Sequence, residues 1–270
     1  MSVRSAAAQW AWLPEAVVRY TTSGTQGRVW LLLHEMGGSL ESWDPVLAQL
    51  PADQRIIRVD ARGHGGSEKI RAEVTVSTLV DDVIALLDHL GITDEVNVAG
   101  VALGGCMALT MAARHPHRVH RVMAINPPTN AVGRSGEILR ERADLANRVG
   151  MRGIVEAALA RSYPPHLRGD EHIFLAYQAR FVANDPGSYA FIVRMLAASD
   201  MAEILPTITV PTVFVSGRDD LVRPPADIAV IAETVPGAGH TVIEGGHIPS
   251  VQAPAALAAA VSDYFGSEDR

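Results

Sequence analysis

Residues 96–115, VNVAGVALGGCMALTMAARH, contain the turn that decides the fold. Residues 96–99 are mostly apolar and predict a buried strand, whereas the residues after Gly105 predict a helix that ends near His115. The intervening Gly100-Val101-Ala102-Leu103-Gly104-Gly105 turns the strand into the helix. It has the form of a strand-to-helix turn so sharp that small residues must flank its apex: Ala102 is the apex, and Gly100 and Gly104 are the flanking glycines.

The rest of the chain alternates between strand and helix patterns. Strands are predicted at residues 17–22, 29–33, 55–59, 119–125, 212–216 and 240–243. Helices are predicted after Ser39, with Trp43, Val46, Leu47 and Leu50 on one face, at 77–90, after Pro225, and at 254–265. This alternation predicts an α/β fold with a mostly parallel, doubly wound sheet.

The pattern changes after Pro127-Pro128, because only helical periodicity continues from there to residue 205. Helices are expected near residues 136–148, 152–161, 171–183 and 188–198. We therefore predict one α/β core made of residues 1–126 and 206–270, with residues 127–205 inserted as a helical cap. Such an insertion would cover the carboxyl edge of the sheet, where open α/β folds bind ligands.

Composition narrows the classes of partner. The 270 residues include 23 Lys and Arg against 30 Asp and Glu, so the net charge is −7 and no basic face for nucleic acid is expected. The single cysteine, Cys106, cannot form an internal disulfide. No apolar run approaches the ~20 residues of a membrane-spanning helix, and residues 1–12 lack the apolar core of a signal peptide. We expect a cytoplasmic protein with a small-molecule substrate and no membrane partner; the sequence does not specify its oligomeric state.

The turn at Ala102 is one of five motifs that occur in a characteristic order. The others are His34-Glu35-Met36-Gly37-Gly38, the loop at residues 60–67, Gly217-Arg218-Asp219-Asp220-Leu221-Val222 and Gly245-Gly246-His247. On these motifs the chain resembles the α/β-hydrolase superfamily over nearly its whole length, and within it 3-oxoadipate enol-lactonases and related small capped serine hydrolases. The resemblance implies an α/β-hydrolase fold whose nucleophile elbow carries Ala102, no cofactor or metal, and hydrolysis of a small ester or lactone, with amide, thioester and C–C bonds left open.

The resemblance also implies the catalytic residues. Ala102 occupies the nucleophile position, His247 supplies the imidazole, and an aspartate after the strand at residues 212–216 orients it. Asp219 and Asp220 compete for that role, and the Gly-x-x-Asp spacing of relatives favours Asp220. Some relatives place the acid after the preceding strand, but that position here is Asn126, an uncharged amide.

The oxyanion hole would be formed by the backbone N–H groups of Met36 and Leu103. Glu35 departs from the glycine or small residue that the family usually has beside this site. Two interpretations remain open: the Glu35 side chain points away and bonds neighbouring backbone, or it borders the pocket and positions a substrate hydroxyl or amine. The residues expected to contact substrate are Glu35, Asn126, Tyr177, Phe181, Val222 and Ile248, with Arg180 or Arg194 meeting a substrate carboxylate.

Alanine at position 102 has two explanations. In the first, which we favour because His247, Asp220 and the elbow glycines are all retained, the chain is an inactive form of a serine hydrolase whose serine has been replaced. In the second, alanine is native. The His247–Asp220 dyad would then serve proton transfer in a lyase, isomerase or cofactor-free oxygenase, or the protein would only bind a ligand.

Other polar residues are expected to be structural. His115, His117 and His120 straddle a helix end without a local carboxylate, so we expect surface residues and not metal ligands. Cys106 follows the apex by one helical turn and is expected to be packed in the core. His240 opens a strand and is given no catalytic role.

Overall fold

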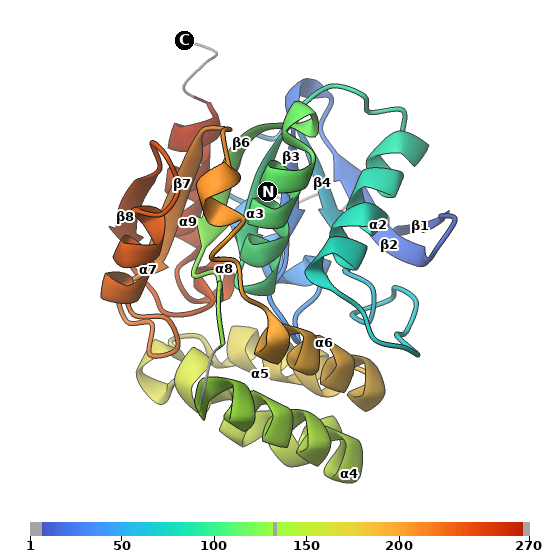
Figure 1. Ribbon diagram of the computed structural model, residues 1–270, viewed down its shortest axis with the longest axis vertical. Helices are drawn as coiled ribbons and strands as arrows, with labels where there is room; N and C mark the ends of the chain where they lie inside the picture. The colour runs from blue at the N-terminus through green and yellow to red at the C-terminus, as the bar shows by residue number, and fades with distance from the viewer. Residues whose placement is uncertain (1–6, 132–133, 267–270) are drawn as a thin grey trace.

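The computed structural model, which describes residues 7–131 and 134–266, is built around an eight-stranded sheet (Figure 1). The strand order is β1-β2-β4-β3-β5-β6-β7-β8, and only β1 with β2 and β2 with β4 pair antiparallel. The strands are β1 Gln9–Trp12, β2 Val17–Ser23, β3 Gln26–Leu33, β4 Gln54–Val59, β5 Val96–Val101, β6 Val119–Ile125, β7 Thr212–Gly217 and β8 Gly239–Ile243. The predicted fold class is confirmed.

Helices cover both faces of this sheet, because its central strands are apolar on both sides. In β3, Leu31 and Leu33 join one core cluster, whereas Trp30 and Leu32 join the other. Helices α2 (Val76–His89), α3 (Leu103–Arg114) and α7 (Pro225–Ala232) pack on the first face. Helices α1 (Asp44–Leu47) and α9 (Pro254–Phe265) pack on the second, and the short α8 (Pro249–Gln252) precedes α9.

In the described part of the segment between β6 and β7, three α-helices form a separate layer, which lies below the sheet in Figure 1. They are α4 (Arg134–Ser162), α5 (Glu171–Val182) and α6 (Pro186–Ala198). A non-helical Gly150 with φ 72° divides α4 at the gap between the two helices that periodicity predicts there. The chain leaves the core for this layer and returns to the core at the same place, because Asn130 and Asp200 form an isolated antiparallel bridge.

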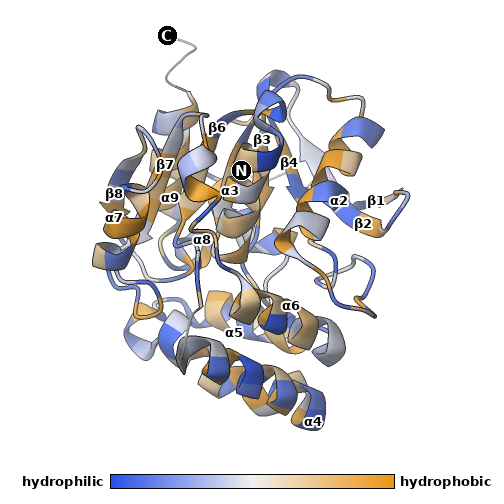
Figure 2. Cartoon of the chain, viewed as in Figure 1, coloured by the Kyte–Doolittle hydropathy of each residue, from blue (hydrophilic) through white to orange (hydrophobic). Residues whose placement is uncertain are grey.

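Hydropathy differs between the two layers. Figure 2 shows α3 as largely hydrophobic, whereas α4 alternates between hydrophilic and hydrophobic patches. Helix α3 is buried between the sheet and its neighbouring helices, so a largely apolar surface is expected. Helix α4 is exposed on its outer side, so a surface with both polar and apolar patches is expected. In the described part of the chain, no helix combines the length and apolar character needed to cross a membrane.

Two local expectations differ from the structure. The helix predicted after Ser39 is a 3₁₀ turn, Leu40–Trp43, followed by the single α-helical turn of α1, which ends at Leu47 before Leu50. Strand β1 was not predicted. It is a four-residue edge strand with Trp10 and Trp12 exposed, so it lacks the buried alternation by which strands are recognised.

The sharp turn between β5 and α3 depends on close backbone contacts at two glycines. A Cβ atom on Gly100 would lie 2.1 Å from the Gly104 carbonyl oxygen, and one on Gly104 would lie 2.3 Å from the Leu33 carbonyl oxygen. Both neighbours are backbone atoms in buried elements, so they cannot move aside easily. The glycines therefore allow α3 to begin directly against β5 and β3.

Replacing Gly100 tests this packing. Gly100→Ala should lower the free energy of unfolding by about 3 kcal/mol or prevent folding, because the added methyl group overlaps backbone atoms. Gly169→Ala is the matched control, since nothing lies within 4 Å of a Cβ there, and it should change stability by less than about 0.5 kcal/mol. Denaturant unfolding of both variants measures the difference, and equal stabilities would contradict the packing account.

Candidate active site

The candidate site lies where parallel strands end at one edge of the sheet. Glu35 follows β3, Ala102 follows β5, Asp220 follows β7 and His247 follows β8. Because β3, β5, β6, β7 and β8 are parallel neighbours, their carboxyl ends share this edge. Residues distant in sequence are thereby brought together at the position where open α/β sheets bind ligands.

Ala102 occupies the apex of the turn in a strained conformation. Its φ is 47° and its ψ is −108°, an unusual region for a residue with a Cβ atom. The turn is held by hydrogen bonds from Ala102 N–H to the Ile125 carbonyl oxygen at 2.8 Å and from Gly104 N–H to the His34 carbonyl oxygen at 3.1 Å. Leu103 begins α3, so its own N–H lies in the first helical turn, where no helix carbonyl is available. That N–H is suited to bind an oxyanion.

His247 and Asp220 form a hydrogen-bonded pair. His247 Nδ1 lies 2.8 Å from Asp220 Oδ2, and the Asp220 side chain is buried. The other carboxylate oxygen, Oδ1, accepts hydrogen bonds from the backbone N–H groups of Val222 at 2.6 Å and Arg223 at 2.9 Å. An ionised carboxylate only accepts, so Nδ1 carries a proton and Nε2 of the neutral ring is left to accept one. Asp219 is exposed and does not make this contact.

Asn126 lies behind the dyad and not in the cavity, which corrects the expectation that it contacts substrate. It is fully buried with φ 47°. Its Nδ2 donates to the carbonyl oxygens of Gly246 at 3.0 Å and His247 at 3.1 Å, while Oδ1 accepts from Gly217 N–H at 3.1 Å. Its amide is thus used to hold the loops that carry His247 and Asp220.

The loop after β3 is fixed by His34, whose role the sequence motif alone did not reveal. His34 Nδ1 donates to the Glu35 carbonyl oxygen at 2.7 Å, and Nε2 accepts from Ala61 N–H at 3.0 Å. These two bonds specify a neutral ring with the proton on Nδ1. They connect the loop that carries Met36 to the loop after β4.

A cavity of ≈ 230 Å³ lies between the core and the helical layer. Its core wall includes Ala102, Leu103 and His247, and its opposite wall includes Tyr177 and Phe181 of α5. Glu35, Met36, Val222 and Ile248 also line it. All the predicted site residues line this cavity except Asn126 and Asp220, and Asp220 joins the site from behind through its hydrogen bond to His247.

The arginines in the cavity differ from those expected. Arg194 instead donates to Asp144 Oδ1 at 2.6 Å, and Arg180 lies over the Tyr177 ring; neither lines the cavity. The lining arginines are Arg142, Arg161 and Arg223. Arg161 bonds the Leu221 carbonyl oxygen, and Arg223 bonds that of Asn130 at 2.6 Å. The sequence could not separate these arginines, because their directions depend on how α4, α5, α6 and the loop after β7 pack against the core.

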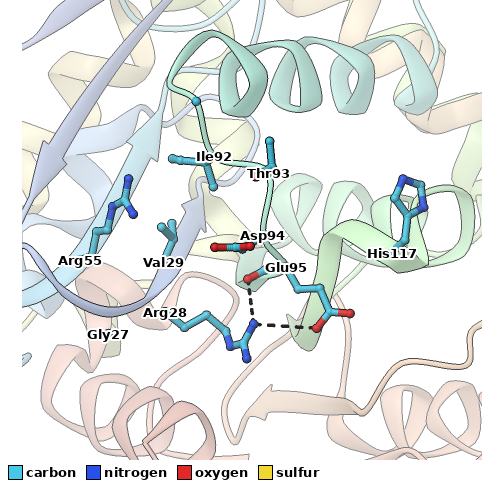
Figure 3. A pocket seen from close by; sticks show the side chains of 10 residues that line it. Gly27, Arg28, Val29, Arg55, Ile92, Thr93, Asp94, Glu95 and His117 are labelled. Atoms are coloured by element: carbon cyan, nitrogen blue, oxygen red, sulfur yellow. Dashed lines mark hydrogen bonds and ion pairs between the residues drawn. The ribbon is translucent and has the colours of Figure 1, made fainter.

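Another hollow lies at the opposite edge of the sheet, near the amino ends of β3, β4, β5 and β6 (Figure 3). Arg28 donates to the Glu95 carbonyl oxygen at 3.0 Å and lies 3.8 Å from the Glu95 carboxylate. Arg55, Asp94 and His117 line the same hollow. It shares no residue with the cavity that contains Ala102 and His247.

The remaining polar candidates have structural partners. Cys106 is buried, burial raises the pKa of its thiol to about 12, and Sγ donates to the Pro128 carbonyl oxygen. His115 and His120 lie beside Asp81 and Glu95, and His240 bonds the Ser216 hydroxyl. Across residues 7–131 and 134–266 no group of three or more His, Cys, Asp or Glu side chains could hold a metal ion.

Known proteins similar to this chain include several hydrolases. A family model described as alpha/beta hydrolase fold matches residues 29–141. The chain is 28% identical over 249 residues to 3-oxoadipate enol-lactonase 2 of Acinetobacter baylyi, with 92% of each protein covered. It is 30% identical over 224 residues to a protein of Pantoea ananatis named as a carbamate hydrolase, with 81% of each covered. The crystal structure of the enol-lactonase from Burkholderia xenovorans LB400 matches with TM-score 0.90 and 28% identity, covering 96% of this chain and 100% of that one.

The two adjacent aspartates allow a matched test of the dyad. Asp220→Asn should remove the downfield proton NMR signal of the His247 Nδ1–H, because a neutral amide accepts this hydrogen bond more weakly than a carboxylate. Asp219→Asn should leave the signal in place, since Asp219 is exposed. Loss of the signal in Asp219→Asn and its retention in Asp220→Asn would show that the partner of His247 has been misassigned.

Proposed function

The chain belongs to the α/β-hydrolase family, and on this premise we propose that its cavity binds a small ester or lactone and is arranged to hydrolyse it through a nucleophile at position 102. The observation that carries the proposal is the His247–Asp220 pair, which lies in one site with the strained turn at Ala102. Relatives named for lactone and carbamate hydrolysis support a substrate with a carbonyl carbon bonded to a heteroatom.

With serine at position 102, the chemistry is acyl transfer. His247 Nε2 takes the hydroxyl proton while the oxygen attacks the substrate carbonyl carbon, and Asp220 stabilises the imidazolium. The tetrahedral intermediate expels an alkoxide, which takes the proton from His247, and an acyl-enzyme remains. A water molecule then loses a proton to His247 and attacks the acyl carbon. The bond to the serine oxygen breaks, that oxygen takes the proton back from His247, and the acid leaves.

The negative charge of each tetrahedral intermediate would be bound by the backbone N–H groups of Leu103 and Met36. Leu103 N–H is in the first turn of α3, where the helix dipole also favours negative charge. Met36 lines the cavity on the loop that His34 fixes. Both donors would then be in place before the reaction starts.

The helical layer would select the substrate. We treat residues 127–205 as a cap domain, because α4, α5 and α6 contribute the cavity wall opposite Ala102. A volume of ≈ 230 Å³ suits a small ester or lactone and not a long acyl chain. Arg142 lines the cavity without an ion pair to any carboxylate in the described part of the chain, and it would meet a carboxylate on the substrate.

Alanine removes only the attacking oxygen from this arrangement. The Ala102 methyl group cannot form the acyl-enzyme, so the present chain would bind its substrate and turn it over very slowly. Alanine and serine at position 102 should give the same fold, because both place a Cβ atom on the strained backbone there.

Restoring the hydroxyl tests the proposal. Ala102→Ser should raise hydrolysis of small esters or lactones by at least about three orders of magnitude, since loss of the nucleophile in another serine hydrolase costs on the order of a millionfold. The assay compares both proteins on a panel of short esters, lactones, amides and 1,3-diketones, each with and without a carboxylate. A preference for amides or diketones would move the chain to another reaction class.

A second candidate function is proton transfer by the dyad alone, which is favoured by one observation: His247 and Asp220 remain paired although position 102 has no hydroxyl. His247→Ala in both backgrounds separates the two functions. If the unaltered chain already reacts quickly with any panel compound and loses that activity in His247→Ala, the reaction does not need a serine, and the second function replaces the first.

A further inference from the structure

Glu35 is a buried carboxylate in the wall of the cavity. It immediately follows His34 after the end of β3, and its relative exposure is only 1%. The same cavity is lined by Ala102, Leu103 and His247. Burying a carboxylate costs free energy unless the charge is compensated, so its place beside the reacting groups requires a physical reason.

The surrounding loop is shaped to hold this side chain. Ser42 Oγ donates a hydrogen bond to Glu35 Oε1 at 2.8 Å. A Cβ atom on Gly38 would lie only 1.9 Å from the same oxygen, so the carboxylate occupies space that any larger residue at position 38 would fill. These contacts correct the first of the two interpretations of Glu35: its carboxylate bonds a serine hydroxyl instead of neighbouring backbone, and the residue lies in the wall of the cavity.

The second carboxylate oxygen, Oε2, accepts no hydrogen bond of good geometry from the described part of the chain, and the Tyr177 hydroxyl is the neighbouring donor that interacts with this carboxylate. Across residues 7–131 and 134–266, no lysine, arginine or histidine forms an ion pair with Glu35. A buried acceptor without a donor loses the hydrogen bonds that it made to water, and such groups are rare in native proteins. A ligand that brings a donor into the cavity would satisfy it.

We propose that Glu35 is a specificity-determining residue, which accepts a hydrogen bond from an O–H or N–H group of the substrate close to the reacting carbonyl. The inference rests on the proposed function, because it assumes that the cavity binds a small ester or lactone. Glu35 directly precedes Met36, whose N–H would hold the carbonyl oxygen. The donor therefore belongs near the carbonyl, as in 2-hydroxy and 2-amino esters.

Tyr177 of α5 lies next to this carboxylate, where the β3 loop meets the wall formed by α5. Burial raises the pKa of the Tyr177 hydroxyl well above its usual value, and the negative charge of Glu35 and a hydrogen bond to its carboxylate raise it further. A hydroxyl or ammonium group between these walls would meet a favourable field.

Three matched esters provide the probes: ethyl 2-hydroxypropanoate, ethyl 2-aminopropanoate as its ammonium form, and ethyl propanoate, which lacks the donor. Their affinities are measured on the unaltered chain by ligand-observed NMR titration, so no turnover is required. We expect the hydroxy or the ammonium ester to bind about tenfold or more tightly than ethyl propanoate. A hydrogen bond to a charged group strengthens binding by about this factor.

Three variants then assign the preference. Glu35→Ala should reduce the ratio of affinities to about one, whereas a purely structural effect would weaken all three esters equally. Glu35→Gln keeps the size and one acceptor, so it should retain part of a hydroxyl preference but lose an ammonium preference. Glu41→Gln is the control, because Glu41 pairs with Arg19 and does not line the cavity; its ratios should match those of the unaltered chain.

The outcomes separate this inference from the proposed function. Equal binding of the three esters to the unaltered chain, or an unchanged preference in Glu35→Ala, would overturn the role of Glu35 and leave the ester site intact. Failure of all three esters to bind the unaltered chain would overturn both. Circular dichroism of each variant confirms that the comparison is made on folded protein.

Discussion

The close approach of α3 to the sheet is the constraint on which the rest of the site depends. Gly100 and Gly104 have no room for a Cβ atom, so the helix starts without any intervening loop. That arrangement forces Ala102 to positive φ and directs the Leu103 N–H toward the carboxyl edge. Strain at one residue is tolerated because the buried strands and α3 determine the path of the chain on both sides.

The other groups of the site are held by side chains that never reach the cavity. Asn126 joins the ends of β6, β7 and β8 through three hydrogen bonds, and this fixes the loops of Asp220 and His247 relative to each other. His34 does the same for the loops after β3 and β4. Pre-positioned groups of this kind lower the reorganisation that a reaction would require. The geometry therefore persists even though alanine stands at the nucleophile position.

Much of this architecture could be predicted because it depends on local pattern. The strand ends, the turn at Ala102 and the break in the helix near Gly150 follow from periodicity and from glycine. These features are decided within a few residues of sequence. The choice of Asp220, the aspartate that contacts His247, came instead from the Gly-x-x-Asp spacing of the family that the chain resembles.

Other features depended on contacts between distant segments. The direction of the Arg142 side chain could not be predicted from the sequence, because it is set by how α4 packs against the core. Asn126 was expected in the pocket, since the sequence shows its place after β6 but not the loop carbonyls that occupy its amide. The role of Glu35 stayed open for a different reason: its partner Ser42 is only seven residues further along, but the sequence pattern does not show that this loop folds back to bring the two side chains together.

The central claim is that a substrate carbonyl binds beside Ala102, between the backbone N–H groups of Met36 and Leu103, without forming a covalent bond. The most direct measurement is a titration of the ¹⁵N-labelled chain with a small lactone, followed by amide NMR shifts. The account predicts that the Leu103 and Met36 amide signals move together and saturably, with the His247 ring signals following. Saturable shifts confined to the hollow around Arg28 and Glu95, with Leu103 and Met36 unmoved, would contradict it.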